Sequence, residues 1–261
     1  MSGNDDRPAA APDADLWASL RRLTAARIGL KRSGASLSTV PSLEFQLAHA
    51  RARDAVHAEF DQQRLAADLV AELGGFDVLA LASAAADKQT YLMRPDLGRT
   101  LSTDAGAALK PYAGPYDVVV VVSDGLSAGA IQSHAAPVMG AFLPALRAEG
   151  WRIAPLVIVR HGRVAIGDRV ATLLSADCVV VLIGERPGLS APDSMGAYLT
   201  WRPNAQTSDA NRNCISNIRP DGIGYADAAI KLAHLLRIMR ARRFSGVRLK
   251  DNSGRLQIGG A

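Results

Sequence analysis

The stretch YDVVVVVSDG, residues Tyr116–Gly125, decides the fold class of this protein. It places five consecutive valines before small polar residues, a pattern typical of a parallel strand that is covered on both faces. Similar apolar runs predict strands at FDVLALAS (Phe76–Ser83), WRIAPLVIVR (Trp151–Arg160) and ADCVVVLIGE (Ala176–Glu185), with a shorter candidate at YLTW (Tyr198–Trp201). The sequence therefore predicts a sheet of mainly parallel strands.

Stretches with apolar residues at helical spacing alternate with these strands. They lie at Leu126–Gly150 and Val164–Ser175, and a strongly amphipathic one follows at Tyr225–Arg243, where arginines in the last turns complement the helix dipole. Such alternation favours right-handed crossovers between parallel strands. We therefore predict an α/β protein with an open, mostly parallel sheet flanked by helices, of Rossmann-like type.

The residues before the first strand are predicted to form an N-terminal helical extension. A short helical pattern covers Leu16–Ala26, and glycines and a proline then interrupt the periodicity in Ala26–Ser42. Ser42–Leu73 carries apolar residues at helical spacing over about eight turns, and Pro41 suits the first position of a helix. This pattern predicts one long amphipathic helix, or two in tandem, ended by the glycine pair that follows.

The chain thus divides into four predicted regions. Residues 1–15 are rich in Ala, Pro and Asp with nothing to bury, which is typical of a disordered leader. Residues 16–75 form the helical region, residues 76–251 the α/β domain, and the glycine-rich residues 252–261 a flexible tail. A chain of 261 residues with 48% hydrophobic content is long and apolar enough for such a core.

Bulk properties argue against several classes of protein. The chain has 30 Lys and Arg against 25 Asp and Glu, but the basic residues are mostly scattered and not interleaved with aromatic ones, which argues against nucleic-acid binding. No apolar run approaches the ~18 residues of a membrane span, and the N-terminus lacks the order of a secretion signal. Two cysteines without metal-type spacing indicate neither disulfides nor a zinc site. We expect a cytoplasmic protein without a membrane or nucleic-acid partner.

Polar residues follow the strand at Tyr116–Gly125, where an open parallel sheet places its ligands. Ser123, Asp124 and Ser127 lie at this point. The alternative is that Asp124 or Ser127 only caps the next helix, and His134 within that helix is expected to be structural. The glycine patterns of dinucleotide-binding and P-loop proteins are missing, as is the hydrolase pattern GxSxG.

A second polar stretch begins with GERPGLS (Gly184–Ser190) at the end of another predicted strand. Beyond it, Asp193–Ala228 contains few apolar residues and is interpreted as a long, ordered but irregular segment. Its many Asn, Ser and Arg side chains suit a large polar ligand that bears amide groups, or a subunit interface.

Single residues in these stretches also have plainer interpretations. Glu185 could simply pair with Arg160 or Arg186, and Cys214 could be a small buried residue, as free cysteines commonly are. His49, Arg53 and His57 recur every four residues, but the two histidines are roughly 12 Å apart on a helix, too far to share a metal ion. This stripe is expected to be a solvated face or a subunit-contact face.

Six segments follow one another in an order that is specific to one family. They are ARIGLKRSG (Ala26–Gly34), LEFQLAHARARDAVH (Leu43–His57), SDGLSAGAIQSHAAPV (Ser123–Val138), GERPGLSAPDSMGAYLTW (Gly184–Trp201), RNCISNIRPDGIGYADAA (Arg212–Ala229) and SGVRLKD (Ser245–Asp251). Together they resemble the small subunit of ethanolamine ammonia-lyase. The resemblance covers roughly Leu16 to Asp251.

The resemblance implies an enzyme that converts ethanolamine to acetaldehyde and ammonia, with adenosylcobalamin as the source of an organic radical. In that family the large subunit, a TIM barrel, holds the substrate, and the small subunit encloses the cofactor from the other side. The resemblance therefore implies a chain that is inactive alone and that forms an oligomer of heterodimers with the large subunit.

By motif, the resemblance assigns cofactor contacts to Val164 in HGRVAIGD, Glu185 in GERPGLS and Cys214 in RNCISN. The backbone of Val164 and the carboxylate of Glu185 would accept hydrogen bonds from corrin amides, and Cys214 would pack against the ring or the nucleotide loop. The resemblance implies no catalytic residue in this chain. The pattern DxHxxG, which gives cobalt a histidine in other B12 enzymes, does not occur, so the lower ligand is expected to remain the cofactor's own benzimidazole.

Two other classes of function stay open. One is a non-catalytic ligand-binding or scaffolding α/β domain, against which the joint presence of GERPGLS and NCISN argues. The other is a stand-alone nucleotide-dependent enzyme, which the missing glycine patterns disfavour. The leader is short and acidic, whereas some relatives carry longer extensions associated with packaging in bacterial microcompartments, so encapsulation is an open question.

Overall fold

The structure is a computed structural model that describes residues 16–251. The chain divides into two compact units, with the boundary between Ala50 and Arg51; they are called unit 1 and unit 2 below. The predicted leader (residues 1–15) and tail (residues 252–261) lie outside the described residues. None of the helices within residues 16–251 has the length and apolarity that crossing a membrane requires.

Unit 1 is a small unit held together mainly by polar and aromatic contacts. Its elements are α1 (Leu16–Arg21), the two-stranded antiparallel pair β1 (Arg32–Ser33) and β2 (Ser36–Leu37), and the first part of α2 (Thr39–His57). Arg21 Nη1 donates to the carbonyl oxygen of Gly29 over 2.8 Å, and the guanidinium of Arg27 lies 5.9 Å from the ring centroid of Phe45. No residue that can be described between 17 and 50 is buried.

Unit 2 is built on a six-stranded sheet in the order β3–β5–β4–β6–β7–β8. The strands are β3 (Val78–Ala82), β4 (Tyr116–Ser123), β5 (Leu156–Arg160), β6 (Ala176–Gly184), β7 (Met195–Trp201) and β8 (Arg212–Ile218). The first four in spatial order are parallel, whereas β7 is antiparallel to both β6 and β8. The predicted α/β class with an open, mostly parallel sheet is confirmed.

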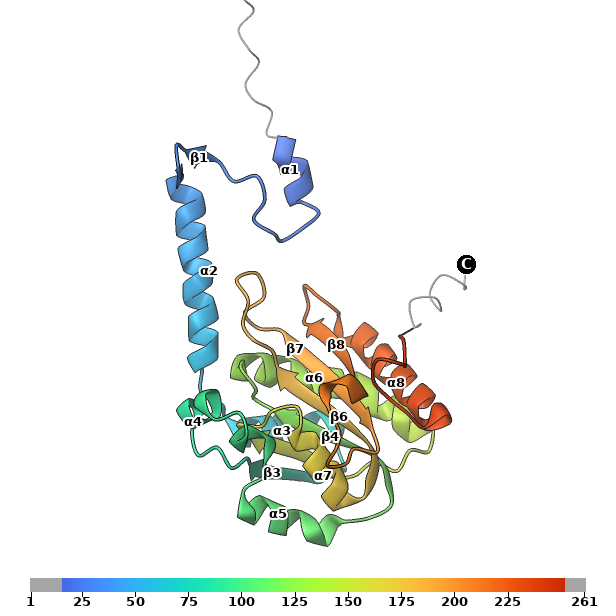
Figure 1. Cartoon of the computed structure of the whole chain (residues 1–261). Coiled ribbons are helices and arrows are strands. Elements are labelled where there is room, and N and C mark those ends of the chain that lie inside the picture. The colour runs from blue at the N-terminus through green and yellow to red at the C-terminus, as the bar shows by residue number, and fades with distance from the viewer. Residues whose placement is uncertain (1–15, 252–261) are drawn as a thin grey trace, which may run out of the picture. The chain divides into compact units, whose positions relative to one another are not determined.

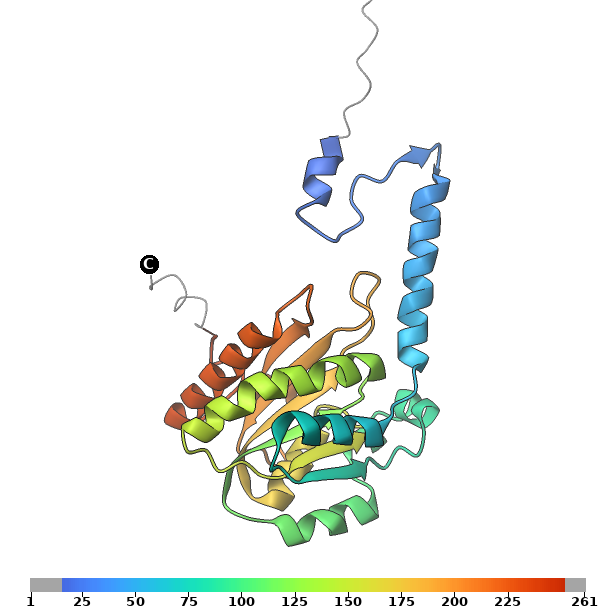
Figure 2. The ribbon, with the colours of Figure 1, turned by 180° about the vertical axis from the view of Figure 1, so that it is seen from behind.

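The consecutive valines of β4 explain why two layers of helices cover the sheet. Because side chains alternate along a strand, Val118, Val120 and Val122 join the core under one layer, and Val119 and Val121 join the core on the opposite face. The first face is covered by α3 (Gln62–Leu73), α6 (Ala128–Ala148) and α8 (Tyr225–Arg242), and the second by α5 (Thr103–Leu109) and α7 (Ile166–Leu174) (Figures 1 and 2). The predicted crossover helices are thus confirmed.

The helical pattern at Ser42–Leu73 forms two tandem helices, one of the two predicted arrangements. α2 begins at Thr39, so Pro41 lies in its first turn, where the missing N–H costs no helical hydrogen bond. The side chain of Asp61 accepts a hydrogen bond from Arg64 N–H and so starts α3. Gly74 ends α3 with φ of 49°, a left-handed value that suits glycine.

The interpretation of Asp193–Ala228 as an irregular segment is wrong. It contains all of β7, which is longer than the predicted YLTW, the short 3₁₀ helix η3 (Asp209–Asn211), and all of β8. β8 was missed because Ile215 and Ile218 are its only apolar residues that face the core, while its other positions carry polar residues or the exposed Cys214, including Arg212, which is buried. A strand at the edge of a sheet does not need the continuous apolar run on which the other strands were recognised.

Several shorter elements complete unit 2. No element was predicted for residues 84–115, which form α4 (Lys88–Met93), α5, and the 3₁₀ helices η1 (Leu97–Arg99) and η2 (Lys110–Tyr112). β5 begins later than predicted, because residues from Trp151 to Pro155 form a connection in which Ala154 N–H donates to the Val118 carbonyl.

The two faces of the sheet differ at its antiparallel end. On the first face, α6 and α8 lie behind β7 and β8 in the view of Figure 1. On the second face, α7 packs against β4 and β6, whereas Cys214 and Ser216 of β8 are exposed. The sheet therefore presents an open polar surface next to the point where β6 ends.

Candidate functional site

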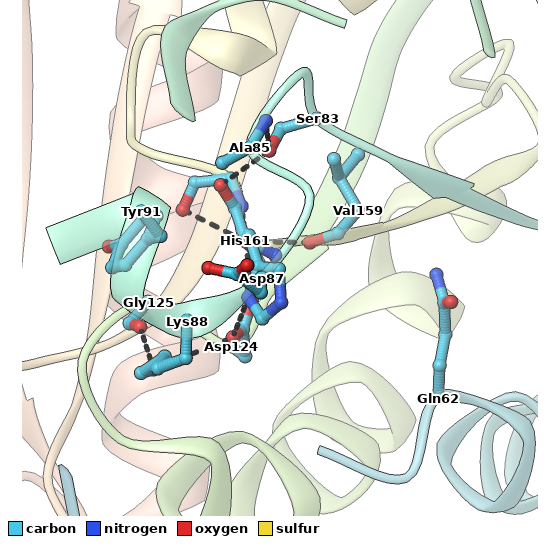
Figure 3. Close-up of polar contacts among 12 residues, drawn as sticks. Gln62, Ser83, Ala85, Asp87, Lys88, Tyr91, Asp124, Gly125, Val159 and His161 are labelled. Carbon is cyan, nitrogen blue, oxygen red and sulfur yellow. Dashed lines mark hydrogen bonds and ion pairs between the residues drawn. The ribbon is translucent and has the colours of Figure 1, made fainter. Parts of the chain in front are cut away.

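The carboxyl ends of three parallel strands meet in a buried polar cluster (Figure 3). Asp124, which follows β4 and is 1% exposed, accepts a hydrogen bond of 2.6 Å from His161 N–H, directly after β5. Its other oxygen lies 3.6 Å from Lys88 Nζ, which donates to the Gly125 carbonyl. Ser83, at the end of β3, donates to the His161 carbonyl. Burial lowers the pKa of Lys88, and the carboxylate of Asp124 opposes that shift.

The polar residues that follow β4 have mainly structural contacts. The Ser123 hydroxyl donates to the Val159 carbonyl over 2.7 Å, which ties β4 to β5. Ser127 accepts a hydrogen bond from Ala130 N–H and caps α6, so the capping alternative is confirmed for this residue. Asp124 does not cap α6 but holds the loop after β5. This cluster therefore fixes the loops at the carboxyl end of the sheet.

Next to this cluster lies a hollow of about 470 Å³, called the carboxyl-end pocket below. It opens between the loop after β4, the loop after β5, the end of β6 and the exposed face of β7 and β8. The residues that matter for its chemistry are Tyr91, Arg163, Val164, Glu185, Tyr198 and Ser216. Two of the three residues predicted from the sequence, Val164 and Glu185, are thus brought to one pocket.

Glu185, which follows β6, is held in the pocket by β8, the edge strand on the far side of β7. Its carboxylate accepts hydrogen bonds from the Ser216 hydroxyl and, over 3.1 Å, from Asn217 N–H. The alternative of a simple pair with Arg160 or Arg186 is not what the described structure contains. Because each carboxylate oxygen can accept more than one hydrogen bond, acceptor capacity remains on the side that faces the pocket.

Val164 lies in the turn between β5 and α7 and is half-buried. Its carbonyl accepts a hydrogen bond of 3.1 Å from Gly167 N–H. A carbonyl oxygen has two lone pairs, so it can accept a second hydrogen bond from a ligand in the pocket.

Cys214 lies on β8 beside the pocket and is exposed, which rules out the alternative of a buried structural cysteine. It shares the open face of the sheet with Ser216, because Ile215 between them points into the core. Its partner across the strands is Tyr198, whose side chain also lines the pocket. Local packing raises the pKa of Cys214, and Glu185 adds to the shift, so the sulfur is a neutral thiol near pH 7.

Four further residues of the pocket were missed from the sequence. Arg163 and Ser216 lie within two residues of the predicted contacts Val164 and Cys214, and Tyr198 lies in the motif that begins with GERPGLS. Their proximity to these motifs could have pointed to them. Tyr91 lies in the stretch for which no element was predicted. Arg163 links the loop after β5 to α4, because its Nη2 donates to the Tyr91 carbonyl over 2.9 Å and its guanidinium lies 4.5 Å from the Tyr91 ring centroid.

The chemistry of the pocket suits recognition of a polar ligand. Burial raises the pKa of Tyr91 to about 12 and also raises the pKa of Tyr198, so both phenols are neutral hydroxyl groups at pH 7. Together with the guanidinium of Arg163 and the carboxylate of Glu185, they provide donors and acceptors around an open space. This set suits a ligand with several amide groups.

Comparisons with known proteins agree with the motifs around this pocket. The family model "Ethanolamine ammonia-lyase light chain" matches residues 14–250. The chain is 51% identical to the ethanolamine ammonia-lyase small subunit of Azotobacter vinelandii over 94% of this chain and 92% of that protein. It is 53% identical to that of Xanthomonas campestris pv. campestris, over 95% and 92% respectively. The chain therefore belongs to the family of ethanolamine ammonia-lyase light chains, the small subunits of that lyase.

Proposed function

We propose that this chain is the small subunit of an adenosylcobalamin-dependent ethanolamine ammonia-lyase, which converts ethanolamine to acetaldehyde and ammonia together with a TIM-barrel large subunit. In this proposal the chain encloses the cofactor and holds no catalytic residue. The observation that carries it is the grouping of Val164, Glu185 and Cys214 around one pocket and the adjoining open sheet face, in a chain whose relatives are small subunits of this lyase.

The donor set of the pocket fits a corrinoid. A corrin ring is broad, flat and edged with amides, and the open face of β7 and β8 beside the pocket offers a surface against which such a ring can lie. The Glu185 carboxylate and the Val164 carbonyl would accept hydrogen bonds from its amide N–H groups, while Arg163 and Tyr198 would donate to amide oxygens. When bound, adenosylcobalamin supplies the organic radical, and the chain supplies binding, orientation and exclusion of water.

The surface of unit 1 supports a protein partner. Val40, Leu43 and Leu47 form one stripe on α2 and are 65%, 58% and 52% exposed. A helix without buried residues gains little stability from packing, so contact with a partner would stabilise it. Residues 16–50 contain five Lys and Arg but one Glu, so a second copy of this unit would bring like charges together.

We propose that this stripe binds an apolar groove on the large subunit, with acidic residues around the rim of the groove. The assembly is proposed to be a cytoplasmic oligomer of such heterodimers. Size-exclusion chromatography with light scattering on the mixed subunits tests this, and a chain that stays monomeric beside the large subunit would contradict it.

A bulky side chain on the open sheet face tests the proposed cofactor site. In the Cys214→Phe variant, the ring would occupy the surface beside Tyr198, so we expect cobalamin to be lost from the mixed complex during gel filtration while the two subunits still elute together. The control is Ala205→Phe, which places the same ring on an exposed loop at the other end of β7. Equal cofactor retention by the two variants would rule out the proposed surface.

A further inference from the structure

A series of polar contacts links buried His134 to Glu185. The role inferred for these contacts rests on the function proposed above, in which Glu185 binds the cofactor. His134, on α6, is 4% exposed. Its Nε2 lies 2.9 Å from the backbone carbonyl of Asp193, and its Nδ1 lies 2.9 Å from the hydroxyl of Tyr225 at the start of α8. Because a carbonyl only accepts, Nε2 carries the proton and Nδ1 accepts from the Tyr225 hydroxyl. Both ring nitrogens of the neutral histidine are therefore satisfied.

The series continues from Asp193 to the turn after β8. The Asp193 carboxylate lies 3.8 Å from Nη1 of Arg219, and Arg219 Nε donates to the side-chain oxygen of Asn217 over 3.0 Å. Asn217 N–H in turn donates to the Glu185 carboxylate. Asn217 has a φ of 59°, a left-handed value in which asparagine is tolerated but not favoured over extended backbone.

We propose that Arg219 and His134 are positioning residues that orient the Glu185 carboxylate toward the cofactor. Arg219 fixes the side chain of Asn217 through their hydrogen bond, and so keeps the backbone N–H of Asn217 directed at Glu185. His134 fixes the backbone at Asp193, whose carboxylate faces Arg219. Neither residue lines the carboxyl-end pocket, so each acts through Asn217 rather than by touching a ligand.

The substitution Arg219→Lys tests the link, because lysine keeps the charge beside Asp193 but lacks the Nε donor to Asn217. We expect the Kd for adenosylcobalamin of the mixed complex to rise about fivefold to tenfold, as for loss of one well-aligned hydrogen bond. The matched control is Arg237→Lys on α8, where Nε donates to Glu149 far from the pocket. The two variants should have similar Tm values, and only Arg219→Lys should change the Kd.

A double-mutant cycle with Glu185→Gln separates the possible outcomes. If Arg219 acts through Glu185, adding Arg219→Lys to the Glu185→Gln variant should raise the Kd no further. Additive effects, or an unchanged Kd for Arg219→Lys alone, would overturn the inference while leaving the cofactor site in place. An unchanged Kd for Glu185→Gln alone would instead remove the proposed cofactor contact itself, and the inference with it.

Hydrogen exchange of the isolated chain gives a readout that needs neither the cofactor nor the partner. The Asn217 amide should exchange faster in Arg219→Lys and in Tyr225→Phe than in the wild-type chain, because both changes loosen the series of contacts. The control Tyr116→Phe alters a hydroxyl at the opposite end of the sheet and should leave that amide unchanged. Equal exchange in all four proteins would contradict the inference.

Discussion

Arg212 on β8 and Asp168 on α7 form a buried ion pair that ties the edge of the sheet to a helix. Arg212 donates two hydrogen bonds of 2.7 Å to the Asp168 carboxylate, and a third to Thr200 on β7. The side chains are 3% and 11% exposed. Removing one partner would leave the other charge buried without compensation, which is costly. This pair holds β8, and with it Cys214 and Ser216, against the rest of the sheet.

The substitution Asp168→Asn is therefore expected to lower the free energy of unfolding by about 3 kcal/mol. Urea denaturation of the isolated chain measures this change. The control is Asp177→Asn, which removes the carboxylate from a pair with Arg202 whose side chains are 38% and 59% exposed. That change should cost less than ~1 kcal/mol because water screens an exposed pair. Equal decreases in the free energy of unfolding of the two variants would contradict the proposal that the buried ion pair holds β8 against the sheet.

His134 makes the stability of the chain depend on pH. Burial lowers its pKa from the ordinary value of 6.5, and the nearby charge of Arg219 acts in the same direction, against the carbonyl and carboxylate of Asp193. The unfolded chain therefore binds the proton at a higher pH than the folded chain does. The contribution of neutral His134 is complete well above pH 6.5 and decreases as the pH falls through this value.

Urea denaturation at a series of pH values between about 7.5 and 5.5 measures this dependence. The free energy of unfolding should decrease more steeply for the wild-type chain than for His134→Gln, in which the amide cannot be protonated in this range. Parallel curves for the two proteins would show that His134 does not contribute to the pH dependence.

At the scale of elements, the end of β6 packs closely against the turn that starts α6. A Cβ atom on Gly184 would lie 2.1 Å from the carbonyl oxygen of Ser127 and 2.5 Å from that of Asp124. Both are backbone atoms, which cannot move without shifting the turn. Glycine is thus required where β6 delivers Glu185 to the pocket.

Gly184→Ala is accordingly expected to destabilise the chain by about 1–3 kcal/mol, the usual range for overpacking. Gly129→Ala in the first turn of α6 is the control, since a Cβ there meets nothing within 4 Å. That change should leave stability unchanged or increase it through helix propensity. Thermal unfolding compares the two variants, and a Gly184→Ala chain as stable as the control would mean that the turn is less tightly packed than described.

The central strands could be predicted because they are buried on both faces. The apolar runs of β4, β5 and β6 fill two apolar faces, which a linear pattern reveals. The edge strand β3 carries a similar apolar run, although its residues are only partly buried or exposed. β8 could not be recognised this way, because its open face bears Cys214 and Ser216. The same polar positions that hid the strand are those that form the candidate site.

The candidate site was predictable in its motif residues but not in its contacts. Val164 and Glu185 could be placed near each other because parallel strands end at one edge of a sheet. The hydrogen bonds to Glu185 from Ser216 and Asn217 depend on the pairing of β7 with β8, and a pairing of distant segments leaves no local pattern in the sequence. Tyr91 reaches the pocket from α4, through the stretch between β3 and β4 whose elements had no clear periodicity.

At the scale of the whole molecule, the exposed stripe on α2 should govern assembly rather than folding. Replacing Leu43 and Leu47 together by serine is expected to weaken binding of the large subunit at least about tenfold, because the contact would lose two apolar side chains. The Tm of the isolated chain should not change, since neither side chain is buried. Gln46→Ser on the same helix is the control. Isothermal titration of the large subunit measures the difference, and unchanged affinity would exclude this stripe as the contact.

The proposed function is tested by measuring the formation of acetaldehyde from ethanolamine, with adenosylcobalamin as cofactor, by this chain alone, by the large subunit alone, and by the two together. We predict turnover only in the mixture, with cobalamin retained by the complex after gel filtration. Turnover by this chain alone, or no turnover by a mixture that has demonstrably assembled and contains cobalamin, would contradict the account.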